Sequence, residues 1–205
     1  MTQQLRCADL RGGDILLKLN AGSLTNRIIN TGQKLAGASN PDVVHAGILF
    51  DSTYIIESSG PGLIASDLRV KDRPYAYYVF RCTNTNVAAG AATCAKMMFD
   101  IQGRTGNLTY TAAGAAASAF GASGKPKTAG DMDALLDRIL QGKSTPFFCS
   151  QFVVFVYQFV AEQNGLSAAT VFDYSDAKSP PSKVAASLVA NALFVEAGYL
   201  VPNER

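Results

Sequence analysis

The spacing of hydrophobic positions along the chain changes near residue 85, from the period of strands to the period of helices. Before that point, short runs rich in Val, Ile, Leu, Tyr and Phe alternate with turn residues, a pattern typical of β-strands. The runs predict strands at residues 14–19, 44–50, 53–57, 63–68 and 76–82. Asp51 and Ser52 alone separate the second run from the third, which predicts a hairpin, and the whole series implies an antiparallel sheet.

After that point, apolar side chains recur every three or four residues, which predicts helices with one buried face. The pattern predicts helices at residues 87–102, 131–142 and 179–194, and before the switch a short helix at 23–35. Ser23 is a favourable N-cap, Gly103 and Gly142 are placed to end their helices, and a proline pair begins the last one. Strands followed by helices place the chain in the α+β class.

The most apolar stretch is PFFCSQFVVFVYQFV, at residues 146–160. Its Val and Phe content would suit a strand. The polar residues are instead spaced seven and four apart, as on one face of a helix: Gln151, Gln158 and Glu162. With Thr145 as the N-cap, Pro146 as the first helical residue and Gly165 after the last turn, Cys149 falls in the first turn of a largely buried helix.

A cysteine in that position has two chemical readings. The unpaired N–H groups and the positive end of the helix dipole favour a thiolate, and the same groups can stabilise an oxyanion on an attacked carbonyl. The alternative is a structural thiol, which is what most cysteines beside Phe and Val are. Position alone favours the structural reading of Cys149.

A nucleophilic cysteine also needs a base, and His45 is the only histidine in the chain. His45 begins an apolar strand, and Glu57 ends the neighbouring hairpin strand, within cross-strand reach. A carboxylate there can accept a hydrogen bond from the second ring nitrogen and fix the tautomer. The alternatives are a hydrogen-bonded core histidine and a solvated carboxylate at the end of a strand.

Composition narrows the class of protein. A length of 205 residues suits one domain over residues 1–205, with an insertion rich in Ala, Gly and Ser around 111–128. A net charge of +2, no Trp and no large basic cluster argue against nucleic acid as a partner. No run reaches the ~18 apolar residues of a membrane span, and the charged N-terminus lacks the apolar centre of a signal peptide. We therefore expect a protein that is cytoplasmic in the producing cell or exported by a signal-independent secretion system.

The four cysteines are scattered, at Cys7, Cys82, Cys94 and Cys149. No pair has the CxxC spacing and there is one histidine, so a zinc site of the usual type is not assembled locally. We expect reduced thiols rather than a disulfide framework at this chain length.

The motifs that contain these residues resemble those of the NlpC/P60 superfamily of papain-like cysteine hydrolases. GGDILL (12–17), HAGILF (45–50) and YIIESS (54–59) resemble its strand motifs, and FCSQFV (148–153) resembles its nucleophile helix. His45 and Glu57 precede Cys149 here, which matches the circularly permuted branch with the YiiX/YaeF-like bacterial proteins. SPPSKVAASL and GRTGNLTY are similar to further segments of that branch.

The resemblance implies a permuted papain-like fold, an antiparallel sheet packed against helices that include the cysteine-bearing one. It implies Cys149 as the nucleophile, His45 as general base and then acid, and Glu57 as the group that orients the imidazole. It also suggests Ser150, Gln151 and Tyr110 as substrate-binding residues, although Gln151 stands where the family leads us to expect Glu. No metal or organic cofactor is implied.

Three functions follow from these patterns as hypotheses. The first is a cysteine amidase or endopeptidase that cleaves peptidoglycan stem peptides, and a short hydrolase without a signal peptide also fits an exported antibacterial effector with an immunity protein as partner. The second is an acyltransferase, thioesterase or lipid-directed hydrolase, as in relatives of lecithin:retinol acyltransferase. The third is a binding module without activity on the same fold.

Overall fold

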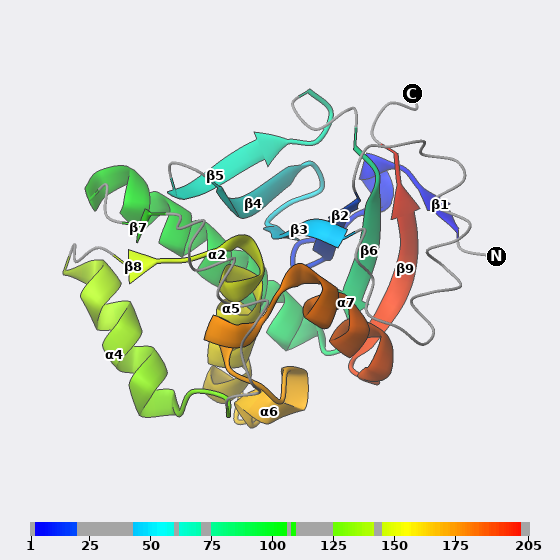
Figure 1. Cartoon of the computed structure of the whole chain (residues 1–205). Coiled ribbons are helices and arrows are strands. Elements are labelled where there is room, and N and C mark those ends of the chain that lie inside the picture. The colour runs from blue at the N-terminus through cyan, green and yellow to red at the C-terminus, as the bar shows by residue number, and fades with distance from the viewer. Residues whose placement is uncertain are drawn as a thin grey trace.

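A computed structural model describes residues 3–19, 43–59, 62–70, 75–105, 108–109, 125–141 and 145–201 (Figure 1). These residues form a mixed α+β structure with a seven-stranded sheet packed against helices. The strand order is β1 (Gln4–Leu5), β9 (Phe194–Leu200), β6 (Tyr77–Cys82), β2 (Ile15–Leu19), β3 (Val43–Leu49), β4 (Tyr54–Ser59) and β5 (Gly62–Asp67). Neighbouring strands are antiparallel, except that β1 runs parallel to β9.

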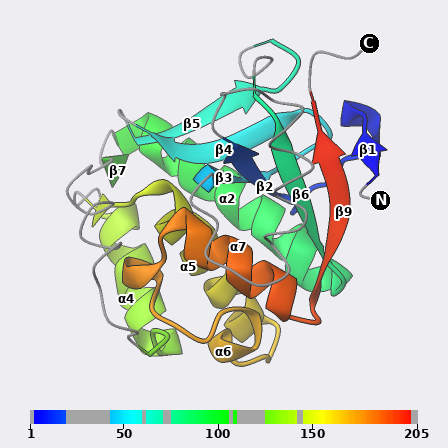
Figure 2. The same cartoon turned by 45° about the vertical axis from the view of Figure 1, so that its right-hand side comes forward.

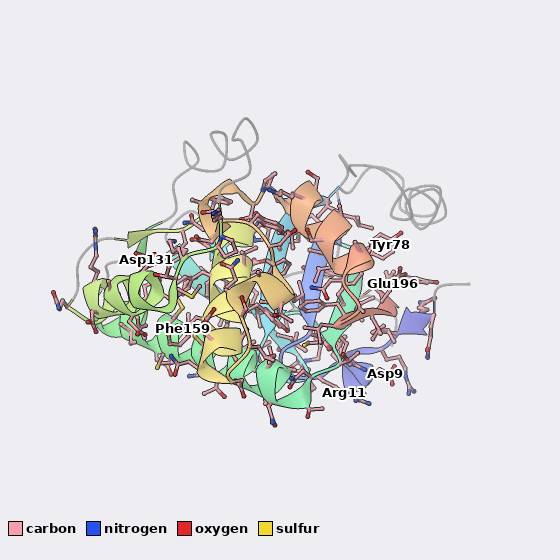
Figure 3. The ribbon with its side chains drawn as sticks, turned by 90° about the horizontal axis from the view of Figure 1, so that it is seen from below. Asp9, Arg11, Tyr78, Asp131, Phe159 and Glu196 are labelled. Atoms are coloured by element: carbon pink, nitrogen blue, oxygen red, sulfur yellow. The ribbon has the colours of Figure 1, made fainter. Side chains whose placement is uncertain are left out.

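Among the described residues, the α-helices follow the strands β1–β6 along the chain, as the change of spacing predicts. They are α2 (Thr85–Thr105), α4 (Ala129–Leu140), α5 (Cys149–Gln163), α6 (Ala168–Val171) and α7 (Pro181–Ala190), with 3₁₀ turns η1 (Cys7–Asp9) and η2 (Asp176–Lys178). A short parallel pair joins β7 (Leu108–Thr109) to β8 (Thr145–Pro146). Figures 1 and 2 show the larger helices gathered on one side and the strands on the other. Seen from below, Asp131 of α4 and Asp9 of η1 lie toward opposite ends of the molecule (Figure 3).

Alternation along the strands divides the hydrophobic side chains between two clusters. Ile15 and Leu17 of β2 belong to the larger cluster, which includes the buried residues of α2, α5 and α7. Leu16 belongs to a smaller cluster together with Leu5 and Leu10 near the N-terminus. Because both faces of β2 are covered, this central strand is apolar along most of its length.

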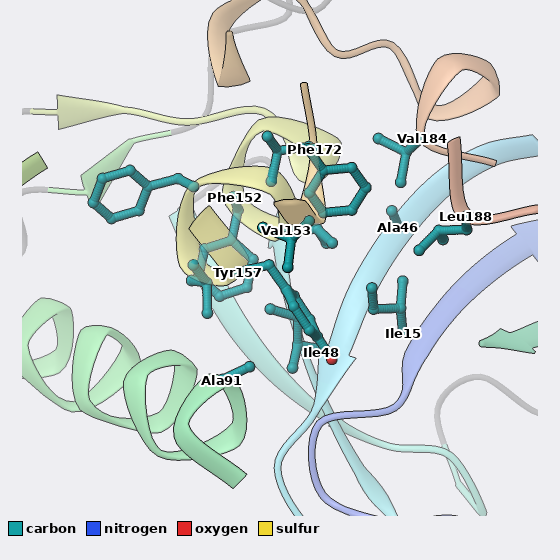
Figure 4. Packing of buried hydrophobic residues seen from close by; sticks show 14 of the residues in the cluster. Ile15, Ala46, Ile48, Ala91, Phe152, Val153, Tyr157, Phe172, Val184 and Leu188 are labelled. Carbon is teal, nitrogen blue, oxygen red and sulfur yellow. The ribbon is translucent and has the colours of Figure 1, made fainter. Parts of the chain in front are cut away.

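Helix α5 lies in the middle of the larger cluster and contacts α2, β3 and β4. Figure 4 shows Val153 and Tyr157 of α5 beside Ile48 of β3, with Val184 of α7 beside Ala46. The Tyr157 hydroxyl donates a hydrogen bond to the Gly13 carbonyl, which satisfies a polar atom in a fully buried side chain. The helix is thus fixed against the sheet along its length.

The start of α5 corrects one prediction and its end confirms another. Thr145 and Pro146 do not begin the helix, because they pair with β7 as the strand β8. Phe148 is the N-cap, with extended backbone angles of φ −100° and ψ 164°, and Cys149 is the first helical residue. At the other end Gly165 has φ +73°, a conformation that glycine adopts at low cost.

The C-terminal part of the chain holds another difference. The predicted helix 179–194 ends at Ala190, and Phe194 begins β9, which pairs with β6. Asn191 turns the chain between them: its carboxamide donates to Thr170 and Val171 carbonyls and accepts from the N–H of Leu193. Gly103, expected after a helix end, lies inside α2.

Some predictions fall on residues outside the described ranges. These are the helix 23–35, Tyr110, Gly142 and most of the 111–128 insertion, of which 125–128 lead directly into α4. Within the described residues, none of the helices has both the length and the apolar character that crossing a membrane requires.

Candidate functional site

Strands β3 and β4 stop pairing where the candidate residues lie. Their register runs from Leu49 opposite Ile55 to Gly47 opposite Glu57, which is their last pair among the described residues. Beyond that pair, β4 continues to pair with β5 as far as Ser59. Gly47 permits this close approach, because a Cβ atom there would lie 2.6 Å from the Ile55 side chain and 2.9 Å from the Ile56 carbonyl oxygen.

His45 and Glu57 meet at this end of the hairpin. The Nε2 atom of His45 lies 3.0 Å from Oε2 of Glu57, an ion pair whose angles depart from those of an ideal hydrogen bond. Glu57 is diagonal to His45 across the strands, a separation that long side chains can span. The side chains are 18% and 4% exposed, so little water screens their interaction.

Cys149 approaches the same point from the helical side. As the first residue of α5, it has a backbone N–H without an acceptor inside the helix. Its thiol is hydrogen-bonded to the His45 ring, and the backbone N–H groups of Ala46 and Ser150 donate to the sulfur. The same ring thus contacts Glu57 through Nε2 and is hydrogen-bonded to the Cys149 thiol.

These contacts shift the pKa values of His45 and Cys149 in opposite directions. Burial lowers the pKa of His45, but the hydrogen bonds and negative charges of Cys149 and Glu57 outweigh it and raise that pKa to about 10. Burial raises the pKa of the Cys149 thiol, but the hydrogen bond and charge of His45, with the two backbone N–H groups, lower it below its ordinary value. Both shifts favour a thiolate–imidazolium pair over a neutral thiol and a neutral imidazole.

Such a pair can perform nucleophilic acyl chemistry. The thiolate is the reactive form of cysteine, and the contacts that lower the pKa of Cys149 favour it before any substrate binds. The imidazolium can protonate a leaving group, and the N–H of Cys149 can donate to an oxyanion. Glu57 holds the ring through Nε2.

The predicted substrate-binding residues are placed differently from the predicted triad. The structure brings Cys149, His45 and Glu57 together, whereas the side chain of Ser150 is fully buried beside them. Gln151 donates from Nε2 to Oδ2 of Asp176 at 3.0 Å, so its amide is held by η2. Tyr110 lies outside the described residues.

Two polar contacts near the site were not anticipated from the sequence. Ser58 donates its hydroxyl to the carbonyl of Phe147, at 2.8 Å, across 89 positions of sequence. Asp176 is fully buried and lies 2.6 Å from Nζ of Lys127, so one carboxylate joins the segment before α4 to the first turn of α5. Ser58 carries a signal in retrospect, because a serine at a strand position that faces the core requires a partner.

Two grooves among the described residues lie apart from the triad. One of about 540 Å³ lies between α6 and α7, and another of about 400 Å³ lies beside β1 and η1. Neither is lined by Cys149, His45 or Glu57. Among the described residues, no group of three or more His, Cys, Asp or Glu side chains is arranged to hold a metal ion.

Comparison with known proteins does not identify a function for the site. No protein-family model matches the chain, and no curated protein matches its sequence significantly. The case for a function therefore depends on the contacts of Cys149, His45 and Glu57, and on the short motifs in which these residues lie.

Proposed function

We propose that this protein is a cysteine hydrolase that cleaves an amide bond through Cys149, His45 and Glu57. The observation that carries the proposal is the position of the only imidazole in the chain, between a helix-terminal thiol and a buried carboxylate. A structural cysteine has no need of either partner. The order of the elements, strands first and nucleophile helix later, supports the permuted NlpC/P60 arrangement.

The reaction begins with attack of the Cys149 thiolate on the carbonyl carbon of the amide. The carbonyl electron pair moves to oxygen, and the N–H of Cys149 stabilises the oxyanion. When the tetrahedral intermediate collapses, the carbon–nitrogen bond breaks, and the imidazolium of His45 gives its proton to the departing amine. An acyl thioester and a neutral imidazole remain.

Hydrolysis of the thioester returns the enzyme to its first state. Neutral His45 removes a proton from water as the water oxygen attacks the thioester carbon. The carbon–sulfur bond then breaks, releasing a carboxylic acid and restoring the thiolate–imidazolium pair. Glu57 stabilises the imidazolium whenever it forms and keeps the ring oriented throughout.

Peptidoglycan stem peptides are the substrates that we propose to test first, because the motifs around the three residues resemble those of NlpC/P60 hydrolases. Purified sacculi and lipid esters are incubated in parallel with the protein, and the products are identified by mass spectrometry. We expect new peptide fragments ending in a free amine and a free carboxylate from the sacculi. Fatty acid release without wall fragments would overturn the substrate class in favour of a lipid-directed enzyme.

Two variants make this experiment specific. Cys149→Ala removes the proposed nucleophile, and Cys94→Ala removes an equally buried thiol on α2. We expect fragments from the wild type and from Cys94→Ala, and none from Cys149→Ala. If wild type and Cys149→Ala release the same products, the hydrolase proposal is wrong.

A further inference from the structure

We propose that Ser58 is a positioning residue, whose hydroxyl holds the peptide before Cys149 so that the sulfur stays aligned with the Ala46 N–H and the His45 ring. The inference rests on the proposed function and adds a residue to its machinery. It starts from one contact, the 2.8 Å hydrogen bond from Oγ of Ser58 to the carbonyl oxygen of Phe147.

Ser58 lies where the sheet and the nucleophile segment meet. It follows Glu57 directly in β4, and it comes after the last pair that β4 forms with β3. Ala46 lies across from this point on β3, also beyond that last pair, and its N–H donates to the Cys149 sulfur. The end of the β3–β4 pairing thus leaves room for the segment 147–149, which contacts both strands.

Two adjacent residues of β4, Glu57 and Ser58, act on His45 and on the segment of Cys149, respectively. Glu57 contacts the imidazole of His45, and Ser58 contacts the backbone two residues before Cys149. The intervening Phe148 is the N-cap of α5, so the position of the Phe147 carbonyl fixes where the helix begins. A nucleophile displaced by about 1 Å loses on the order of a hundredfold in rate, which makes such a constraint consequential.

A purely structural role for Ser58 makes a different prediction. The Phe147 ring is buried and packs against Phe155 with a centroid distance of 5.4 Å, which anchors the same segment by hydrophobic contact. If that anchor is sufficient, loss of the hydroxyl changes the stability of the fold and leaves the pKa of the Cys149 thiol unchanged. If the hydroxyl positions the sulfur, its loss weakens the contacts that keep the thiol ionised.

The test measures the alkylation rate of Cys149 by iodoacetamide across a range of pH, in wild type, Ser58→Ala, Ser58→Thr and Ser66→Ala. Ser66 is a buried serine of β5 and serves as the matched control. In Ser58→Ala we expect the midpoint of the profile to rise by about one pH unit and the rate below that midpoint to fall about tenfold. We expect Ser58→Thr, which keeps the hydroxyl, and Ser66→Ala to follow the wild type.

Alkylation does not require substrate, so the inference and the proposed function fail in different ways. A wild-type midpoint at an ordinary thiol value would overturn both. A lowered wild-type midpoint that Ser58→Ala shares would overturn the positioning role alone. A Ser58→Thr variant whose midpoint rises as much as that of Ser58→Ala would also overturn it. A Ser58→Ala protein that unfolds where Ser66→Ala is folded would also overturn it, because the hydroxyl would then be a requirement of the fold.

Discussion

Cys149 and Cys94 are equally buried thiols on neighbouring helices, yet their surroundings shift their pKa values in opposite directions. Cys149 is 4% exposed at the start of α5, and Cys94 is 5% exposed in the middle of α2. Burial alone raises the pKa of Cys94 to about 12. The same burial acts on Cys149, but His45 and two backbone N–H groups reverse its effect. Burial thus raises the pKa of both thiols, and only the polar neighbours of Cys149 outweigh this effect.

The remaining thiols support the same distinction. Burial is the main cause of the raised pKa of Cys82, and it also dominates at Cys7, where Arg69 and Asp67 act in opposite directions. Neither of these cysteines begins an α-helix beside an imidazole. Of the four thiols, only that of Cys149 has a lowered pKa.

Replacing each member of the compared pair by alanine has the largest expected effect. Cys149→Ala is expected to reduce turnover at least about a thousandfold, because no other group supplies the nucleophile. Cys94→Ala is expected to keep turnover and to lower the free energy of unfolding by about 1 kcal/mol through a small cavity. Product release from substrate and urea unfolding measure the two effects. An inactive Cys94→Ala or an unfolded Cys149→Ala would remove the distinction between the two thiols.

Removing the imidazole should make Cys149 resemble Cys94. In His45→Ala the sulfur keeps its backbone donors but loses the cation that faces it, so the pKa of the thiol is expected to rise above its ordinary value. Turnover is expected to fall at least about a hundredfold, since the general acid and base is lost. Ultraviolet absorbance of the thiolate, read against Cys149→Ala, reports the ionisation. A thiolate that persists in His45→Ala would contradict the assigned cause.

Neutralising Glu57 has a smaller effect with a definite sign. The negative charge of Glu57 raises the pKa of His45, so Glu57→Gln lowers that pKa and the ring loses its proton at lower pH. In the wild type we expect a high-pH limb of kcat/KM that reflects protonated His45, near the pKa of about 10, and in Glu57→Gln we expect this limb at lower pH. Turnover at neutral pH is expected to fall about tenfold. An unchanged high-pH limb would show that Glu57 does not act on the ring.

The last expected effect concerns stability at high pH and leaves turnover unchanged. Burial raises the pKa of the Cys94 thiol from its ordinary value of 9.0 to about 12, so its stabilising contribution is complete below pH 9 and is lost as the pH rises toward 12. The loss is at most about 1.4 kcal/mol for each pH unit. Cys94→Ala is expected to show a flatter fall of unfolding free energy over this range than the wild type. Equal slopes in urea unfolding series would contradict the raised pKa of Cys94.

The sequence predicted the elements that a periodic pattern determines. Five strands, the hairpin that joins His45 to Glu57, and the buried helix that ends just before Gly165 all follow from spacing and turn residues. The pattern failed where long-range pairing decides: Phe194 continues an apolar run after α7 but pairs with Cys82 in the sheet, and Pro146 pairs with β7 rather than starting a helix.

The candidate site was only partly accessible from the sequence for the same reason. Cys149, His45 and Glu57 are residue types with recognisable chemistry, so they were candidates before their positions were known. Ser58 acts through a backbone carbonyl 89 positions away, and Ala46 acts through its N–H group, so the chemistry of their side chains does not mark them. Contacts made by backbone groups emerge only when the segments are brought together.

The most direct test is a competition among the thiols of the folded protein. Brief treatment with limiting iodoacetamide at about pH 6 is followed by mass spectrometry of each cysteine-containing peptide. Cys7 is more exposed than Cys149 and would react first if accessibility decided the rate. We expect Cys149 to react at least about tenfold faster than Cys7, and to lose this lead in His45→Ala. If Cys149 reacts no faster than Cys7 or Cys82, the thiolate–imidazolium pair does not exist.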